Sequence, residues 1–380
     1  MRRLVLPSCD ITRSTINAVV MLHKMGEPAM KSITIGMDLG DKNHVVCVMD
    51  DTGKIITQCT VENSQESLMS FFSKYTGATV AMEAGTHSPW ISRKLSVLGC
   101  SVLVGNPRKL RVIWDSNEKS DERDAKMLAQ IARFDPGLLY PIMHRGQQAQ
   151  LDLEILQARD VLVKSRTKLI NHVRSSIKSF GERLPSCGPE IFHDKVPNSI
   201  PEPLKETLMP VLEIIGNLSM QIKAYDDQIE KVSKECYPET ELLRRIKGVG
   251  PLTALAFILI IEDPSRFAKS RQVGSFVGLT PRRDQSGEID KQLRITKAGN
   301  PYLRRLLVGA AQYVLGPFGE DCNLRRFGLR LAGRGGKNAK RRAVVAVARK
   351  LAVLLHRLWQ YGEIYEPLYN PRKRKLQKAA

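Results

Sequence analysis

The sequence predicts an α/β domain at the N-terminus, followed by a larger all-α region. Three observations carry this prediction. Apolar runs alternate with helix-like segments between residues 33 and 104, as expected for a mixed sheet covered by helices. Two long stretches, 147–180 and 212–236, place apolar residues at steps of three and four, which indicates long paired helices. Residues 239–365 then contain helical segments interrupted by a glycine turn and a basic loop.

The composition favours a nucleic-acid partner. The chain has 380 residues, 42% of them hydrophobic, so it can form two or three domains with buried cores. Its formal net charge of +20 favours a polyanion, most simply nucleic acid. No apolar run is long enough to span a bilayer, and the basic residues do not line one amphipathic helix, so no membrane partner is expected. The seven cysteines form no Cys-x-x-Cys pair, which is typical of reduced thiols in a cytoplasmic protein.

The N-terminal domain, expected over residues 31–145, opens with an acidic residue at a strand end. The apolar run from Ile33 to Met37 leads directly to Asp38, and glycines lie on both sides of that aspartate. A carboxylate there is placed to hold a metal ion or to face a phosphate, because it contributes nothing to packing. A β-hairpin is expected to follow over residues 44–61, with its turn at 50–54.

Three more acidic residues follow in the same domain. A buried strand is expected to end at Glu83, two residues before Gly85. Ser120 is a good helix N-cap, so Asp121 and Asp124 lie at positions i and i+3 on one face of the first helical turn. Acids in a first turn also complement the helix dipole, which is the simpler interpretation of this pair taken alone. Together with Asp38, these residues give four carboxylates that can converge at one edge of a sheet.

Carboxylates in this arrangement suit Mg²⁺, because hard cations prefer oxygen ligands. Two such ions about 4 Å apart could clamp a phosphodiester, so two Mg²⁺ ions per site are the expected cofactor. The expected metal ligands, which are also the expected catalytic acids, are Asp38, Glu83, Asp121 and Asp124. Openings of this kind occur in ribonuclease-H-like folds and in the actin and sugar-kinase ATPases. The ATPase interpretation is disfavoured because no second Asp-x-Gly phosphate loop follows residue 130.

The segment 146–238 is expected to form coiled-coil helices. A second apolar stripe, from Leu212 to Cys236, follows a proline-rich link at 184–210. The first stripe comprises Leu151, Ile155, Ala158, Leu162, Leu169, Val173, Ile177 and Phe180. The two stripes can pair as an antiparallel hairpin within one chain or form a seam between subunits, and both alternatives stay open. A homo-oligomer, a dimer or a tetramer, is the expected assembly.

The C-terminal domain, 239–365, carries candidate contacts to nucleic acid. A helix, the turn at 247–251 and a second helix resemble a helix-hairpin-helix, in which glycines admit a phosphate close to the backbone. Such contacts are independent of base sequence, and an ordinary helix turn is the alternative. The expected contact residues are Lys247, Gly248, Gly250, Arg282, Arg283, Lys291, Arg294, Lys297, Arg304 and Arg341. Two terminal segments, 1–30 and 366–380, are expected to be a flexible basic leader and a basic tail.

Ser286 is a candidate nucleophile. It is expected in a glycine-bearing loop among arginines and lysines, after a helix over residues 266–277. A lone serine in a loop is most often a turn former. Cationic neighbours, however, lower the cost of deprotonating a hydroxyl group and hold a scissile phosphate. Ser275 and Thr280 are neighbouring hydroxyl groups that remain alternatives.

The order of these motifs resembles that of one family. The motifs are Gly-Met-Asp-Leu-Gly at 36–40, Met-Glu-Ala-Gly at 82–85, Ser-Asp-x-x-Asp-Ala at 120–125, Gly-Val-Gly-Pro at 248–251 and Gly-Leu-Thr-Pro-x-x-x-x-Ser-Gly at 278–287, with the coiled coil between the third and the fourth. They resemble the Asp-Glu-Asp-Asp insertion-sequence transposases, also called bridge-RNA-guided recombinases. The resemblance extends from about residue 32 to residue 365.

The resemblance implies a RuvC-type ribonuclease-H-like domain and a C-terminal transposase domain. The family's four acids fall on Asp38, Glu83, Asp121 and Asp124, and its nucleophilic serine falls on Ser286. It also implies that DNA is cut and rejoined through a phosphoserine intermediate, in a composite site with domains from different subunits. A noncoding RNA is implied to pair with donor and target DNA.

Two other functions remain possible for these residues. In a RuvC-like, metal-dependent, structure-specific endonuclease, the carboxylates would activate water and Ser286 would only form a turn. In a non-catalytic nucleic-acid-binding protein, the acids would be structural. Strand transfer that depends on a divalent metal separates the recombinase from the binding protein, and a covalent protein–DNA species separates serine chemistry from hydrolysis.

Overall fold

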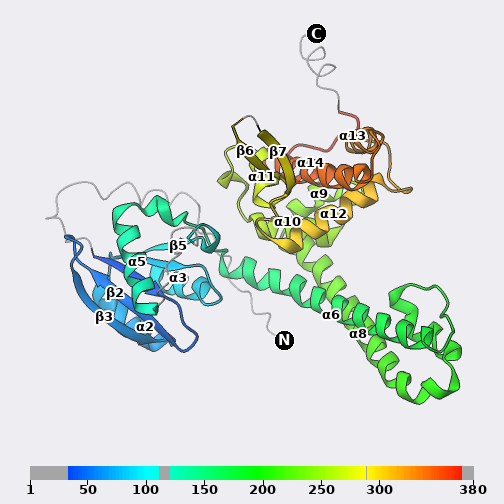
Figure 1. Cartoon of the computed structure of the whole chain (residues 1–380), viewed down its shortest axis with the longest axis horizontal. Coiled ribbons are helices and arrows are strands. Elements are labelled where there is room, and N and C mark those ends of the chain that lie inside the picture. Colours follow the sequence, from blue (N-terminus) through cyan, green and yellow to red (C-terminus); the bar gives the residue numbers. More distant parts are fainter. Residues whose placement is uncertain (1–32, 111–119, 288, 370–380) are drawn as a thin grey trace, which may run out of the picture. The chain divides into compact units, whose positions relative to one another are not determined.

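The structure is a computed structural model that describes residues 33–110, 120–287 and 289–369. The chain divides into two units, an N-terminal unit that ends at His144 and a C-terminal unit that begins at Arg145 (Figure 1). The predicted leader, 1–30, and all but the first four residues of the predicted tail lie outside the described residues.

The N-terminal unit contains the mixed α/β fold that the sequence predicts. Its five strands lie in the order β3-β2-β1-β4-β5; β1 is antiparallel to β2 and parallel to β4, β2 is antiparallel to β3, and β4 is parallel to β5. The elements are β1 (Thr34–Asp38), β2 (Asn43–Met49), β3 (Ile55–Glu62), α2 (Gln65–Phe72), η1 (Ser73–Tyr75), β4 (Thr79–Glu83), α3 (Ser88–Val97), β5 (Ser101–Gly105), α4 (Pro107–Leu110), α5 (Asp121–Phe134) and η2 (Pro136–Leu139). The predicted hairpin after Asp38 is therefore formed by β2 and β3.

The alternation of side chains along β1 assigns each residue to one face of the sheet. Ile35 and Met37 are fully buried in the cluster that also contains the apolar residues of α2 and α3. Because successive side chains of a strand point to opposite faces, Gly36 and Asp38 face the other side. That side is covered by α5, whose Ala125 and Ala129 pack beside β2. Asp38 thus lies on the face of the sheet that α5 covers.

Gly36 allows α5 to pack directly on β1. A Cβ atom at this position would lie 1.9 Å from the carbonyl oxygen of Ala125 and 2.5 Å from the backbone nitrogen of Ala129. Both neighbours are helix backbone atoms, which cannot move aside as a side chain can. The absence of a side chain at Gly36 therefore fixes how closely the acidic N-terminus of α5 approaches the end of β1.

We expect Gly36→Ala to destabilise the N-terminal unit by about 3 kcal/mol, since the added methyl group must push α5 away. The matched control is Gly85→Ala, because a Cβ atom at Gly85 meets nothing within 4 Å. Calorimetric unfolding of the full chain with both variants measures the difference. Equal melting temperatures for the two variants would contradict this account of the packing.

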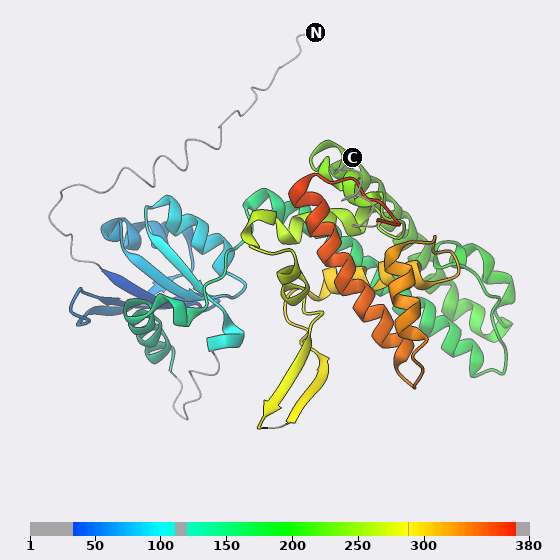
Figure 2. The same ribbon diagram turned by 90° about the horizontal axis from the view of Figure 1, so that it is seen from above.

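The C-terminal unit contains two long helices and a helical body. Its elements are α6 (Gln147–Lys178), η3 (Pro189–Ile191), α7 (Phe192–Lys195), η4 (Pro197–Ser199), α8 (Glu202–Glu235), α9 (Glu239–Arg244), α10 (Pro251–Ile261), η5 (Pro264–Arg266), α11 (Arg271–Phe276), β6 (Pro281–Ser286), β7 (Ile289–Ile295), α12 (Pro301–Leu315), α13 (Asn323–Ala332) and α14 (Ala339–Tyr361). Figures 1 and 2 show α6 and α8 running side by side within the chain. Of the two pairings left open by the sequence, the structure contains the hairpin within one chain.

The seam of this hairpin differs from the predicted stripe. Leu151 and Phe180 were expected in the stripe, but they are 56% and 55% exposed. At the middle of the seam, Arg159 donates to both carboxylate oxygens of Asp226 at 2.6 and 3.1 Å, and the nearly buried Arg166 donates to Ser219 Oγ at 3.1 Å. The predicted stripe contains only apolar residues. Arg159 and Arg166 can lie in the seam because polar partners on the other helix compensate their charge.

The proline-rich link is shorter than predicted and is folded. Helix α8 begins at Glu202, inside the segment 184–210 that was expected to be a link. Between the two helices, Phe192, Val196 and Ile200 pack into a cluster with the distal ends of α6 and α8. The link therefore supplies a separate small core at the tip of the hairpin.

The near end of the hairpin belongs to the core of the helical body. Leu153 and Leu156 of α6 and Ile229 of α8 share one cluster with the apolar residues of α10, α12 and α14. Helix α10 is the centre of this core, since its residues from Thr253 to Ile261 are all buried. The predicted helix over residues 266–277 is instead a short turn, η5, followed by α11.

Candidate active site

Four acidic side chains are brought to one edge of the N-terminal sheet. Asp38 ends β1 and Glu83 ends β4, the parallel neighbour of β1. Glu83 shares a face with Ala81, which packs in the cluster under α5. Asp121 and Asp124 lie in the first turn of α5, whose N-cap Ser120 accepts a hydrogen bond from the backbone N–H of Arg123 at 3.3 Å. Both strand ends and the helix start are thus on the same side of the sheet.

The pKa of Asp38 reflects its position among the other three carboxylates. The pKa of its carboxyl group is raised from 3.8 to about 6. Burial is the largest cause, and the negative charges of Asp121, Asp124 and Glu83 add to it in that order. A carboxyl group is affected in this way only by charges that lie near it. Three residues separated from Asp38 by 45 to 86 positions in the sequence are therefore its neighbours in the fold.

The chemistry of these side chains fits a hard divalent cation. The group consists of carboxylates, which supply the oxygen ligands that Mg²⁺ prefers. Among the residues that the structure describes, no three His, Cys, Asp or Glu side chains are grouped tightly enough to hold a metal ion as they stand. Carboxylates without a cation repel one another, and a cation between them would cancel the repulsion that raises the pKa of Asp38.

Three histidines lie near this edge, and no motif in the sequence indicates them. Nε2 of His87 lies 3.3 Å from a carboxylate oxygen of Asp41, and Oγ of Ser88 lies 2.9 Å from Nε2 of His144. His44 is fully buried and its pKa is lowered by that burial. A histidine in a run of mixed residues has no characteristic spacing, so only the fold brings these rings together.

Ser286 lies at the end of a strand, not in the loop that was predicted. It is the last residue of β6 and pairs with Ile289 at the start of β7. Its side chain is exposed, and Gly287, which follows it, has a φ of 56°. Figure 2 shows this hairpin, in yellow, extending away from the helices of the C-terminal unit. The prediction failed because the charged sequence Arg-Arg-Asp-Gln has no apolar alternation, and strand pairing alone defines β6.

The base of this hairpin is tightly anchored. A Cβ atom at Gly278 would lie 2.1 Å from the carbonyl oxygen of Ala298, and one at Gly299 would lie 1.9 Å from that of Phe276. Arg304 donates to the carbonyl oxygens of Val277 and Ala298 at 3.1 and 2.9 Å. The guanidinium group of this predicted phosphate ligand therefore supports the hairpin base.

The other predicted contacts to nucleic acid are mostly exposed. Arg282, Lys291, Arg294, Lys297 and Arg341 have exposed side chains. Arg283 is paired with Asp290 across the hairpin at 3.0 Å, and Lys247 lies 3.5 Å from Glu320. These residues offer positive charge along β6 and β7 and at the start of α14.

The two glycines of the turn between α9 and α10 differ in their surroundings. Gly248 has a φ of 95°, and a Cβ atom there would lie 2.9 Å from the ring of Tyr313. Gly248 is thus required for packing against α12. A Cβ atom at Gly250 would meet nothing within 4 Å, and this residue precedes the first turn of α10. Of the two, only Gly250 leaves the backbone open to a phosphate.

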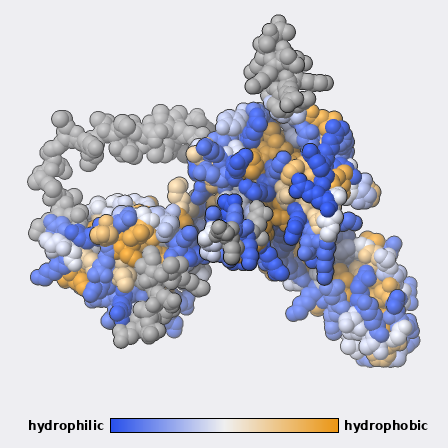
Figure 3. Space-filling model, turned by 45° about the horizontal axis from the view of Figure 1, so that its top comes forward, coloured by the Kyte–Doolittle hydropathy of each residue, from blue (hydrophilic) through white to orange (hydrophobic). Residues whose placement is uncertain are grey.

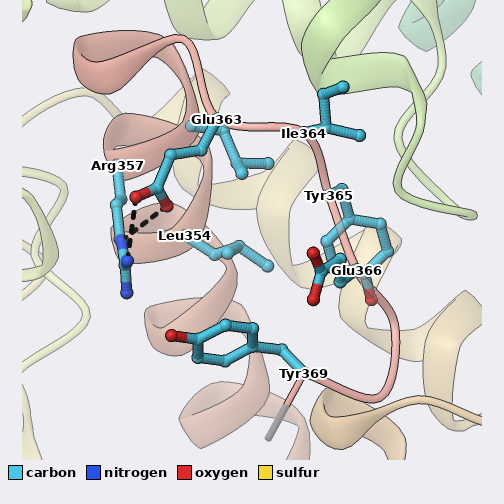
Figure 4. A pocket seen from close by; sticks show the side chains of 8 residues that line it. Leu354, Arg357, Glu363, Ile364, Tyr365, Glu366 and Tyr369 are labelled. Carbon is cyan, nitrogen blue, oxygen red and sulfur yellow. Dashed lines mark hydrogen bonds and ion pairs between the residues drawn. The ribbon is translucent and has the colours of Figure 1, made fainter. Parts of the chain in front are cut away.

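A cavity of about 340 Å³ lies elsewhere in the C-terminal unit, between the end of α14 and residues 363–369 (Figure 4). Leu354 and Tyr365 line it, and so do Arg357 and Glu363, which pair with each other at 3.0 Å. None of the predicted site residues lines this cavity.

No helix within the described ranges is long and apolar enough to cross a membrane. Figure 3 shows hydrophilic residues over much of the visible face of the chain.

A five-stranded mixed sheet with carboxylates at the ends of β1 and β4 and at the start of α5 is typical of ribonuclease-H-like enzymes that act on nucleic acid. A family model described as a transposase, of the Asp-Glu-Asp-Asp IS110 type, matches residues 35–181. A second, described as the IS116/IS110/IS902 transposase family, matches residues 240–320. The first range includes all four carboxylates, and the second includes Ser286.

Similar proteins lead to the same class. The transposase for insertion sequence element IS1111A of Coxiella burnetii is 29% identical over 360 residues, which cover 91% of this chain and 95% of the relative. The transposase for IS1328 of Yersinia enterocolitica is 28% identical, over 74% of this chain and 84% of its own. A pilin gene-inverting protein of Moraxella lacunata is 32% identical over 37% of this chain and 44% of its own. The chain is thus similar to transposases of the IS116/IS110/IS902 family in two separate ranges, and to individual insertion-sequence transposases over most of its length.

Proposed function

We propose that the protein cuts and rejoins DNA strands to mobilise an insertion sequence, using a carboxylate metal site and a serine nucleophile. The observation that carries the first part is that the ends of β1 and β4 and the first turn of α5 bring four carboxylates together, where burial and the charges of Asp121, Asp124 and Glu83 raise the pKa of Asp38. Four gathered carboxylates destabilise the fold unless something positive neutralises them. A divalent cation is the simplest answer, and such a cation can also bind a DNA phosphate.

Each part of the carboxylate site has a definite task in this proposal. Asp38, Glu83, Asp121 and Asp124 would hold Mg²⁺, two ions per site. When bound, the metal supplies Lewis-acid polarisation of the phosphate. Asp38 and Glu83 are held by paired strands and the two aspartates by a capped helix, so the ligand positions are set by rigid elements.

Ser286 is proposed as the nucleophile. Its Oγ would attack phosphorus as the bond from phosphorus to the leaving sugar oxygen breaks, while the hydroxyl proton passes to solvent or to a base. A sugar hydroxyl of the second DNA strand would then displace Ser286, which restores a phosphodiester and consumes no other reactant. Its position at the end of β6, exposed and beside Gly287, supports access to a phosphate. Arg282, Lys291 and Arg294 lie on the same hairpin and would stabilise the negative charge.

The resemblance to bridge-RNA-guided recombinases supports two further proposals. A noncoding RNA would pair with donor and target DNA, and a dimer or tetramer would bring the carboxylate site of one subunit to Ser286 of another. Because α6 pairs with α8 within one chain, other segments would form the contacts between subunits.

The direct test is a strand-joining reaction. Wild-type protein is incubated with labelled donor and target DNA, with and without the guide RNA, in Mg²⁺ or in EDTA. Joined product that requires Mg²⁺ supports the recombinase. Cleaved but unjoined DNA would favour the RuvC-like endonuclease, and unchanged DNA with tight binding would favour the non-catalytic alternative.

Nucleic-acid affinity is expected to fall steeply with salt, by about 10³-fold between about 50 and 200 mM, because each neutralised phosphate releases counterions. Arg341→Ala, which removes an exposed charge at the start of α14, should reduce the slope of log K against log salt by about one. The matched control is Arg326→Ala, since Asp321 already pairs with that guanidinium. Fluorescence anisotropy at several salt concentrations measures both slopes, and a flat wild-type profile would contradict a backbone-dominated interface.

A further inference from the structure

One tyrosine of the N-terminal unit has an unusual backbone. Tyr140 has φ 47° and ψ 60°, the left-handed region that side chains other than glycine, asparagine and aspartate rarely adopt. Holding a tyrosine there is less favourable than holding a glycine, because the Cβ atom comes close to the following carbonyl oxygen. A residue that only closes a turn would gain nothing from this side chain, so the ring itself requires an explanation.

The segment around Tyr140 is rigid although the ring is exposed. The backbone N–H of Tyr140 donates to the carbonyl oxygen of Gly137 at 2.9 Å. On either side, Leu139 accepts from the backbone N–H of Asn106 at 2.9 Å, and Ile142 donates to the carbonyl oxygen of Val104 at 2.8 Å. Leu139 is fully buried, whereas Tyr140 is 49% exposed. The fold therefore anchors the backbone that carries the ring and leaves about half of the residue in solvent.

This position adjoins the carboxylate edge of the sheet. Asn106, which holds Leu139, follows Gly105, and Gly105 pairs with Glu83 across β4 and β5. Leu139 also packs in the cluster beneath α5, the helix that carries Asp121 and Asp124. Tyr140 is thus attached to the strand next to the one that ends at Glu83, and its anchor lies on the same side of the sheet as the four acids.

The ammonium group of Lys109 lies over the ring of Tyr140. Nζ of Lys109, in α4, lies 5.3 Å from the centroid of the Tyr140 ring. Lys109 is anchored to the same residue as Leu139, since its backbone N–H donates to the carbonyl oxygen of Asn106 at 3.0 Å. An aromatic ring and a lysine on one rigid support can offer a stacking face for a base and a charge for the adjoining phosphate.

We propose that Tyr140 and Lys109 form a binding site for one unpaired nucleotide of the strand that enters the carboxylate site, with the base stacked on Tyr140 and its phosphate beside Lys109. This inference rests on the proposed function, because it takes the strand at the carboxylates as its ligand. A base is the ligand that fits an exposed, positioned ring: every base has an aromatic face, so the site accepts any sequence in DNA or RNA. The strained backbone then serves to aim the ring.

Because the backbone of Tyr140 is strained, replacing this residue should affect the melting temperature and the oligonucleotide affinity in opposite directions. Tyr140→Gly removes the ring and relieves the left-handed residue, so its melting temperature should equal or exceed that of the wild type. Its affinity for a single-stranded oligonucleotide should fall about tenfold, the loss of one stacked base. Tyr140→Asn, which also tolerates this backbone, should behave in the same way. Tyr140→Phe should bind within about twofold of the wild type, because phenylalanine keeps the stacking face.

Anisotropy titrations of the full chain with single-stranded DNA, single-stranded RNA and duplex DNA provide the readout. A loss confined to the single-stranded ligands supports the site, and the larger loss of the two identifies DNA or RNA as the source of the base. Unchanged affinity in Tyr140→Gly, an equal loss for the duplex, or a loss in Tyr140→Phe as large as in Tyr140→Gly would each overturn the inference. Wild-type protein that binds none of the three ligands would instead overturn the proposed function.

Discussion

Asp38→Asn is expected to reduce DNA cleavage by about three orders of magnitude while raising the melting temperature of the metal-free protein at pH 7. Cleavage is lost because an amide is a poor ligand for Mg²⁺. Stability rises because the substitution removes a buried charge that lies among three others. A substitution in a purely structural carboxylate would not produce these opposite effects.

The sign of the pH dependence follows from the direction of the pKa shift. The carboxyl group of Asp38 titrates at about 6 in the folded protein and at 3.8 as an ordinary aspartate, so the folded state binds more protons between these values. The free energy of unfolding of the wild type, relative to that of Asp38→Asn, is therefore highest below about pH 4. It falls by roughly 1–3 kcal/mol as the pH rises through 6. Above that pH, Asp38→Asn should be the more stable protein.

Calorimetric unfolding of both proteins in EDTA between pH 4 and 8 measures this difference. Glu122→Gln is the matched control, because it removes a charge from the same helical turn as Asp121 but does not affect the pKa of Asp38. Adding Mg²⁺ should raise the melting temperature of the wild type and of Glu122→Gln, but not that of Asp38→Asn. Parallel pH profiles for wild type and Asp38→Asn would mean that the four carboxylates are not neighbours.

Ser286→Ala is expected to abolish the covalent protein–DNA species and the recombinant product while leaving nucleic-acid affinity unchanged. The side chain is exposed at the end of β6, so its truncation opens no cavity and should change stability by less than about 0.5 kcal/mol. The reaction is run on labelled DNA and denatured, and the label that stays with the protein is measured. Ser286→Cys tests whether another nucleophile at the same position keeps a trace of adduct.

The neighbouring hydroxyl groups serve as controls. Ser275 lies in α11 and Thr280 lies directly before β6, and alanine at either position should leave the adduct in place. Tyr302 is a weaker alternative, since burial and the charge of Asp160 raise the pKa of its phenol to about 12 and oppose its ionisation. Adduct that persists in Ser286→Ala would transfer the role to one of these residues. Active cleavage without adduct in the wild type would favour hydrolysis by the endonuclease alternative.

The elements that carry the four acids could be predicted from short segments. The end of β1 at Asp38, the end of β4 at Glu83 and the capped start of α5 at Asp121 are each indicated by an apolar run or a cap within a few residues. The alternation of strands and helices then indicated a mixed sheet, in which the parallel strands β1, β4 and β5 end at one edge. The neighbourhood of the four acids could be predicted for this reason.

Two of the failed predictions depend on residues distant in the sequence. The strand β6 exists because it pairs with β7, and its own charged residues do not indicate a strand. Arg159 lies in the seam between the two helices because Asp226, on the other helix, pairs with its guanidinium group.

The sequence by itself determined where each element that carries an acid begins or ends, because caps, glycines and apolar periodicity act over one or two turns. The tertiary structure alone decided how closely α5 approaches β1 at Gly36, how far the pKa of Asp38 rises, and that Tyr140 is held exposed in a left-handed conformation. Distances between backbones, the burial of charge and backbone strain each arise from contacts between segments remote in the chain, and no local pattern of residues encodes them.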